Sequence, residues 1–148
     1  MQAIRVVVLA VLAALAVLAG MGGGRADPVA APVVVEHYTS QGCAACLPSD
    51  IFFAELAGRE DVIALALHVD YWDYMGWRDG FAQPRFTARQ KAYARAARSR
   101  ILYTPQMIVA GSAEVPGFRP MQVIELIQAA RARPPVVRLS LVRAGEEL

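Results

Sequence analysis

The stretch Gly42-Cys43-Ala44-Ala45-Cys46 holds the only two cysteines of the chain, spaced as C-x-x-C. The apolar run Val33–Tyr38 before it predicts a buried strand, and Leu47–Gly58 after it predicts a helix. The cysteine pair therefore lies where a strand passes into the start of a helix. Free backbone N–H groups and a partial positive charge at a helix start favour a thiolate over a thiol.

The remainder of the chain continues in alternating strands and helices. Apolar runs over 62–69, 106–110 and 113–115 predict strands. Periodic apolar positions predict helices over 84–100 and 120–133. Parallel strands joined by helices come first, and an antiparallel hairpin follows. This order predicts an α/β protein with a thioredoxin-like fold: a three-layer α/β/α core and a mixed sheet with a C-terminal antiparallel hairpin.

Pro48 constrains where the first helix begins. A proline in a helix interior clashes with the preceding turn, whereas a proline in the first turn is tolerated. We therefore expect the first turn to begin near Ala44 or Ala45. This start would place Cys43 exposed at the N-terminal end of the helix and Cys46 inside its first turn.

The N-terminal segment has the pattern of a secretory signal peptide. A positively charged start precedes the apolar run Val6–Leu18, which is too short to span a bilayer comfortably. We expect a signal peptide over residues 1–26 rather than a retained anchor, and a thioredoxin-like domain over 27–133. The protein would then be exported, either to the periplasm or as a secreted protein, where disulfides persist.

Residues 134–148 are expected to begin a further β segment. Val137, Leu139 and Leu141 alternate with Arg138 and Ser140, which is the pattern of a strand. A lone strand beyond the core needs partner strands, so we expect this C-terminal β extension to be truncated.

The charge balance gives no sign of a nucleic-acid partner. The chain carries 15 basic and 13 acidic side chains, a formal net charge of +2. The excess lies in Arg5 and Arg25, which signal cleavage would remove. We therefore expect no nucleic-acid partner and, after cleavage, no membrane partner.

The cysteine pair favours thiol–disulfide exchange over two other roles. A structural bridge across so small a loop contributes only about 2 kcal/mol by the chain-entropy estimate. A zinc site needs two ligands besides the two thiolates, and the only histidines, His37 and His68, do not form a finger-like pair. We predict that Cys43 is the nucleophile and Cys46 the resolving thiol, with no cofactor. A metal site and a structural bridge stay open as alternatives.

Thr104-Pro105 and the aromatic loop over 70–83 are the candidate substrate-binding parts. Thioredoxin-like folds place a cis-proline beside the cysteines, and here Pro105 directly precedes an apolar strand. The backbone at this position would pair with an extended substrate, and a trans proline that only starts the strand is the alternative. Trp72 and Trp77 are expected to line a peptide-binding surface or, alternatively, to cover the core.

Glu36 is a candidate proton acceptor on the first strand. A buried carboxylate there could take the proton from Cys46 during exchange. A solvated or hydrogen-bonded structural carboxylate is the alternative. His37 and His68 are expected to be core histidines rather than bases.

Five motifs in fixed order resemble the exported bacterial domain-of-unknown-function family 1223. They are Thr39-Ser40-Gln41-Gly42-Cys43-x-x-Cys46, His68-Val69-Asp70-Tyr71-Trp72-Asp73, Gly76-Trp77-x-Asp79, Phe86-Thr87-x-Arg89-Gln90 and Tyr103-Thr104-Pro105-Gln106-Met107. The resemblance implies a thioredoxin-like fold, no assigned substrate, and redox-site roles for Cys43, Cys46 and Pro105. It also implies a longer β-rich tail than this chain has.

Together these features predict thiol–disulfide exchange on exported proteins through the C-x-x-C pair. The expected partners are protein or peptide thiols and disulfides and an upstream redox partner. The alternative is a non-catalytic module that binds copper, zinc or a protein through the same surface.

Overall fold

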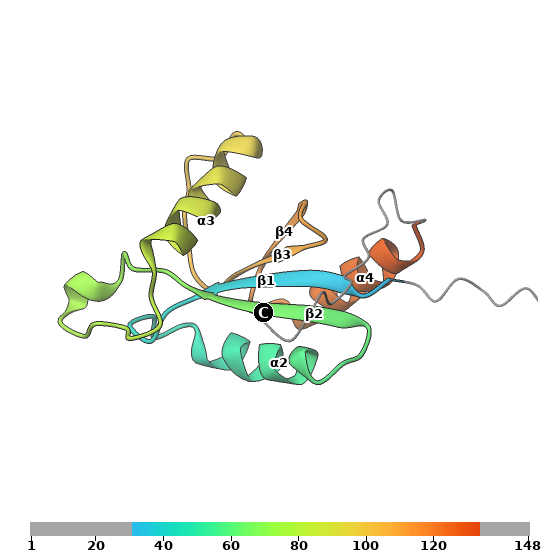
Figure 1. Cartoon of the computed structure of the whole chain (residues 1–148), viewed down its shortest axis with the longest axis horizontal. Coiled ribbons are helices and arrows are strands. Elements are labelled where there is room, and N and C mark those ends of the chain that lie inside the picture. The colour runs from blue at the N-terminus through green and yellow to red at the C-terminus, as the bar shows by residue number, and fades with distance from the viewer. Residues whose placement is uncertain (1–30, 134–148) are drawn as a thin grey trace, which may run out of the picture.

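The computed structural model describes residues 31–133 as a sheet with helices on both faces (Figure 1). The expected signal peptide and the expected C-terminal β extension lie outside these residues. Along the chain the elements are β1 (Val33–Thr39), α2 (Leu47–Ala57), β2 (Val62–His68), the 3₁₀ helix η1 (Asp73–Met75), α3 (Pro84–Ala96), β3 (Gln106–Val109), β4 (Ala113–Pro116) and α4 (Pro120–Arg131). The strands and helices expected within residues 31–133 are therefore confirmed.

The four strands form one mixed sheet in the order β2-β1-β3-β4. β1 pairs with β2 in parallel and with β3 antiparallel, and β3 and β4 form an antiparallel hairpin. The predicted α/β class, mixed sheet and hairpin are confirmed. Because β1 has a strand on each side and helices on both faces, nearly all of its residues are buried.

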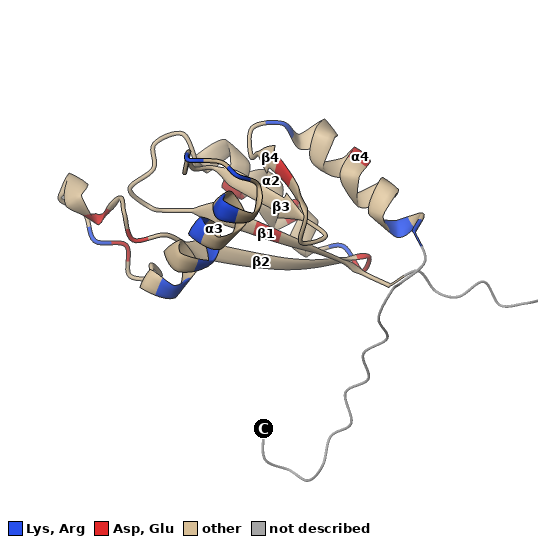
Figure 2. Cartoon of the chain, turned by 90° about the horizontal axis from the view of Figure 1, so that it is seen from above, with Lys and Arg blue, Asp and Glu red and all other residues tan. Residues whose placement is uncertain are grey.

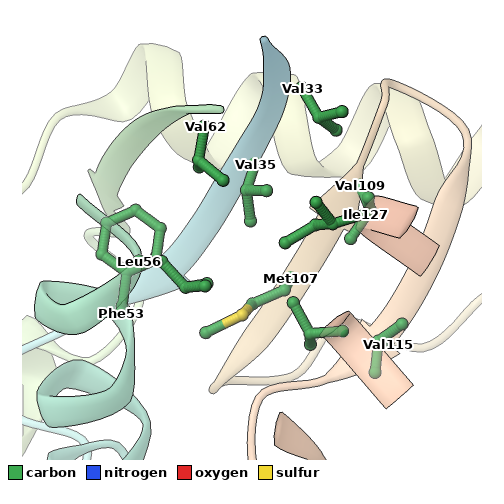
Figure 3. Packing of buried hydrophobic residues seen from close by; sticks show 10 residues of the cluster. Val33, Val35, Phe53, Leu56, Val62, Met107, Val109, Val115 and Ile127 are labelled. Atoms are coloured by element: carbon green, nitrogen blue, oxygen red, sulfur yellow. The ribbon is translucent and has the colours of Figure 1, made fainter. Parts of the chain in front are cut away.

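One face of the sheet is covered by α2 and α4. Val33 and Val35 of β1 and Met107 of β3 point into this layer, where they meet Leu56 of α2 and Ile127 of α4 (Figure 3). Burying a side chain of this size is worth about 1.5–3 kcal/mol relative to leaving it exposed. This layer is the larger of the two buried hydrophobic clusters, and it holds α2 at a fixed position on the sheet.

The opposite face is covered by α3. Since successive strand residues point to opposite faces, Tyr38, Leu67 and Ile108 lie on this side and pack against Phe86 and Tyr93 of α3. Figure 2 shows several Lys and Arg positions, coloured blue, along α3. Helices on both faces give the molecule three layers.

The helix ends differ slightly from the expected ones. α3 stops at Ala96 rather than near Arg100, because Arg98 adopts a left-handed backbone conformation (φ 55°) and the Ser99 N–H donates to the Ala94 carbonyl at 2.8 Å. No glycine or proline marks this stop, so no sequence signal predicts it. Within residues 31–133 no helix has the length and apolar character needed to cross a membrane.

Candidate functional site

Cys43 and Cys46 are joined by a disulfide at the junction of β1 and α2. The Cys46 N–H donates to the Cys43 carbonyl at 3.0 Å, and the Asp50 N–H donates to the Cys46 carbonyl at 2.9 Å. The second bond is the first one of α2, so the disulfide closes the turn directly before the helix. Pro48 lies within the first helical turn, where an N–H would have no intrahelical partner.

Both cysteines are buried, which corrects the expectation that Cys43 is exposed at the N-terminal end of the helix. Cys43 is 6% exposed and Cys46 is 1% exposed. The two alanines between them are exposed and form the turn before α2, so the expected helix start at these alanines is corrected as well. The aromatic loop packs against the residue before Cys43: a Cβ added to Gly42 would lie 3.1 Å from the Trp72 Cβ.

Asp79 joins the aromatic loop, between β2 and α3, to the cysteine loop, residues 40–46 between β1 and α2. This buried carboxylate accepts hydrogen bonds from the Gln41 N–H at 2.8 Å, from His68 Nδ1 at 2.7 Å and from the Phe81 N–H at 2.9 Å. Burial alone would raise the pKa of Asp79, but these donors, led by the Gln41 N–H, hold the pKa below its ordinary value. An ionised Asp79 therefore anchors the loop beside the disulfide.

Each tryptophan of the loop donates a hydrogen bond to another segment of the predicted site. Trp72 donates from Nε1 to Thr104 Oγ1 at 2.8 Å, and Trp77 donates from Nε1 to Gln41 Oε1 at 3.1 Å. Trp77 is 64% exposed, whereas Trp72 is partly buried. The fold thus brings Trp72, Trp77 and Thr104 to the cysteine loop.

Pro105 lies beside the first turn of α2. Its peptide bond with Thr104 is cis, as expected. The Gly117 N–H donates to the Pro105 carbonyl at 2.8 Å, and a Cβ added to Gly117 would lie 2.8 Å from the Pro105 Cβ and would clash with Ser49 Oγ. Ser49 is in the first turn of α2, three positions after Cys46. Sequence analysis missed Gly117, whose only visible signal was the turn-forming Pro-Gly pair.

Glu36 lies on the opposite face of the sheet from α2. Its carboxylate accepts hydrogen bonds from Arg89 Nε at 2.6 Å and Nη2 at 2.8 Å, and from the hydroxyls of Tyr93 and Tyr38 at 2.7 and 2.9 Å. Burial alone would raise the pKa of Glu36, but these partners, led by Arg89, lower it. The structure does not bring Glu36 to the cysteines, because alternate residues of β1 face opposite helices.

His37 is the titratable residue of β1 that faces α2. Its Nε2 donates to Asp50 Oδ1 at 2.8 Å, and Thr39 Oγ1 donates to the same oxygen at 2.7 Å. The buried His37 ring packs against Phe53, with 4.9 Å between ring centroids. Sequence analysis missed Asp50, although its spacing of four from Cys46 on a helix places the two on one stripe.

The described residues also bear on the metal-site alternative. Within 31–133 no group of three or more His, Cys, Asp or Glu side chains could hold a metal ion. His37 binds Asp50 and His68 binds Asp79, so each histidine already has a carboxylate partner. A structural zinc site requires four protein ligands.

Comparisons with known proteins give one family and one solved structure. Residues 34–147 match the family described as "Protein of unknown function (DUF1223)". The chain is also similar to AGR_C_4864 from Agrobacterium tumefaciens, known from an X-ray crystal structure, at 39% sequence identity and a TM-score of 0.66. The similarity covers 72% of this chain and 48% of that one, so this chain spans about half the length of that protein. No curated protein matches.

Proposed function

The chain belongs to the family of proteins of unknown function DUF1223, and we propose that it carries out thiol–disulfide exchange on exported proteins. One observation carries the proposal: the Cys43–Cys46 disulfide occupies the turn directly before α2. A helix start favours the thiolate that such chemistry requires. A disulfide across so small a loop adds little stability, which favours exchange over a structural bridge.

The proposal includes a thioredoxin-like fold for residues 27–133. The support is a mixed sheet with α2 and α4 on one face and α3 on the other, and a cysteine pair before α2. Export rests on the apolar leader within the proposed signal peptide, residues 1–26. Residues 134–148 would add the start of a C-terminal β segment.

In the proposed reaction the Cys43 thiolate attacks one sulfur of a partner disulfide. A mixed disulfide forms, and the partner's other sulfur leaves as a thiolate. Cys46 then attacks the Cys43 sulfur, which closes the Cys43–Cys46 disulfide and releases the partner's second thiolate. The chain loses two electrons and the partner gains them, and the reverse sequence oxidises a partner dithiol. An upstream redox partner would reset the pair.

Cys43 takes the nucleophilic role because it is the more exposed cysteine and precedes the turn. We assign the substrate contacts to Thr104 and Pro105, and to Trp72 and Trp77 of the aromatic loop. The Trp72–Thr104 hydrogen bond supports this assignment, because Trp72 also packs against the residue before Cys43. A partner peptide in an extended conformation would pair with the backbone at Thr104.

The variant Cys46→Ala tests the proposal. It leaves the nucleophile but removes the resolving thiol, so a mixed disulfide with partner proteins should accumulate and disappear on reduction. Cys43→Ala is the matched control and should trap far less. Equal trapping by both variants, or none by either, would contradict the proposal. Metal analysis of the reduced protein tests the copper or zinc alternative.

A further inference from the structure

The resolving cysteine needs a proton acceptor that the sequence did not identify. Cys46 is 1% exposed, so its thiol has little direct contact with water. The thiolate is the attacking species, and a nearby group must therefore take the proton. Glu36 faces α3, and Asp79 is occupied by three donors in the aromatic loop.

Asp50 is the carboxylate on the stripe of α2 that begins at Cys46. The two residues are four positions apart, and Asp50 bonds through its N–H to the Cys46 carbonyl at 2.9 Å. Side chains so spaced on a helix are neighbours, with about 5–6 Å between their Cβ atoms. Both side-chain donors, from His37 and Thr39, bond to Oδ1, which leaves Oδ2 for another proton. The Asp50 side chain is 41% exposed, so a proton that it accepts can pass on to solvent.

His37 is the buried partner of this carboxylate. Its Nε2 carries the hydrogen that Asp50 accepts, which leaves Nδ1 as a buried acceptor with no hydrogen-bond partner. The residues directly beside His37 in the neighbouring strands are Ala66 in β2 and Met107 in β3, and neither carries a titratable group.

We propose that the His37–Asp50 pair accepts the Cys46 proton when the mixed disulfide is resolved. Cys46–SH gives its proton to the pair, the resulting thiolate attacks the Cys43 sulfur, and the departing partner thiolate recovers a proton. Because a 2.8 Å hydrogen bond joins the two groups, we assign the proton to the pair rather than to either residue. This inference rests on the proposed exchange function.

The test uses the reduced full chain and an aryl disulfide whose released thiolate is coloured. Attack by Cys43 releases one aryl thiolate, and attack by Cys46 on the mixed disulfide releases the second, so each step has its own phase. Asp50→Asn removes the acceptor charge while keeping the shape. Glu55→Gln is the matched control, because Glu55 is an exposed carboxylate of the same helix.

We expect Asp50→Asn to slow the second phase about tenfold or more near neutral pH and to leave the first phase unchanged. The difference should vanish as the pH rises past the ordinary thiol range, about 8.5. His37→Gln should slow the second phase in the same pH range, and Glu55→Gln should match the unaltered chain. An Asp50→Asn second phase equal to that of Glu55→Gln at every pH would overturn the inference.

The unaltered chain provides a measurement that does not depend on any variant folding. If the pair acts, the second-phase rate should be nearly flat between about pH 7 and pH 8. A rate that falls tenfold per pH unit below about pH 8.5 would overturn the inference. Failure of the exchange function itself is distinguishable: both phases would occur with the aryl disulfide while protein disulfides stayed unchanged.

Discussion

Trp72 and Thr104 are joined by a 2.8 Å hydrogen bond from the indole Nε1 to the hydroxyl oxygen, across 32 positions of sequence. Trp72 also packs against Gly42, the residue before Cys43. Three segments that are distant in sequence therefore meet at the disulfide: the cysteine loop, the aromatic loop and the segment that carries the cis-proline. The arrangement places the aromatic loop beside the residue that precedes Cys43, which supports the proposed substrate-binding role of the loop.

The Trp72–Thr104 bond should be measurable by a double-mutant cycle. Trp72→Phe and Thr104→Val each remove one partner, and we expect a coupling free energy of about 1 kcal/mol in urea unfolding. The coupling arises because the second substitution costs less once the bond is gone. Strict additivity of the two single-variant effects would show that the bond does not contribute to stability.

Gly117→Ala should destabilise the fold by about 1–3 kcal/mol or more. The added methyl group would lie 2.8 Å from the Pro105 Cβ and clash with Ser49 Oγ, so either β4 or α2 must shift. Gly80→Ala is the control, because a Cβ there has no atom within 4 Å. Equal unfolding midpoints for the two variants would contradict the close approach of Pro105 to α2.

Glu36→Gln should remove part of the pH dependence of stability. The partners of Glu36 lower its pKa in the folded state, so ionised Glu36 stabilises the folded chain. This stabilisation is present above the unfolded pKa, about 4.3, and is lost as the pH falls through the folded pKa. Near neutral pH the variant should lose about 2 kcal/mol, because Arg89 and two tyrosines lose a charged acceptor. Urea unfolding between pH 3 and 7 measures both effects.

Glu60→Gln is the control for that experiment, since Glu60 is an exposed carboxylate before β2. Its stability should follow the pH dependence of the unaltered chain. If Glu36→Gln also follows that pH dependence, then Arg89 does not stabilise Glu36 in its ionised form.

Reducing the disulfide should lower the free energy of unfolding by only about 2 kcal/mol, because the loop that it closes is very short. The reduced chain should stay folded, which exchange chemistry needs since both redox states must function. Thermal unfolding with and without a reductant measures the difference. Loss of the folded state on reduction would mean that the bridge is structural.

The fold was largely predictable because its signals are local. Apolar runs identified the strands, and the strand–C-x-x-C–helix order located the disulfide before α2. Prediction was weakest where the outcome depends on packing between distant segments. Cys43 is buried and the aromatic loop packs at Gly42 beside it, and no sequence pattern near Cys43 predicts either.

Local sequence also does not predict which of Glu36 and His37 faces α2. Glu36 and His37 are adjacent in sequence, and their separation by one position sends them to opposite faces of β1. Which face carries α2 depends on how the helix crosses the sheet, and this crossing is set by the apolar layer around Leu56 and Met107. The sequence predicted Glu36 as the acceptor and His37 as a core histidine, whereas the packing turns His37 toward Asp50, the pair to which we assign the role.

The most direct test of the account follows two electrons between this chain and a peptide with two cysteines. One mixture starts from the oxidised chain and the dithiol peptide, and the other from the reduced chain and the disulfide peptide. Thiols are trapped by alkylation and counted by mass spectrometry. Exchange predicts that both mixtures converge on one ratio, and that the chain with Cys43→Ala leaves its mixtures unchanged. Mixtures that keep their starting states with the unaltered chain would contradict exchange and leave Cys43–Cys46 as a structural bridge.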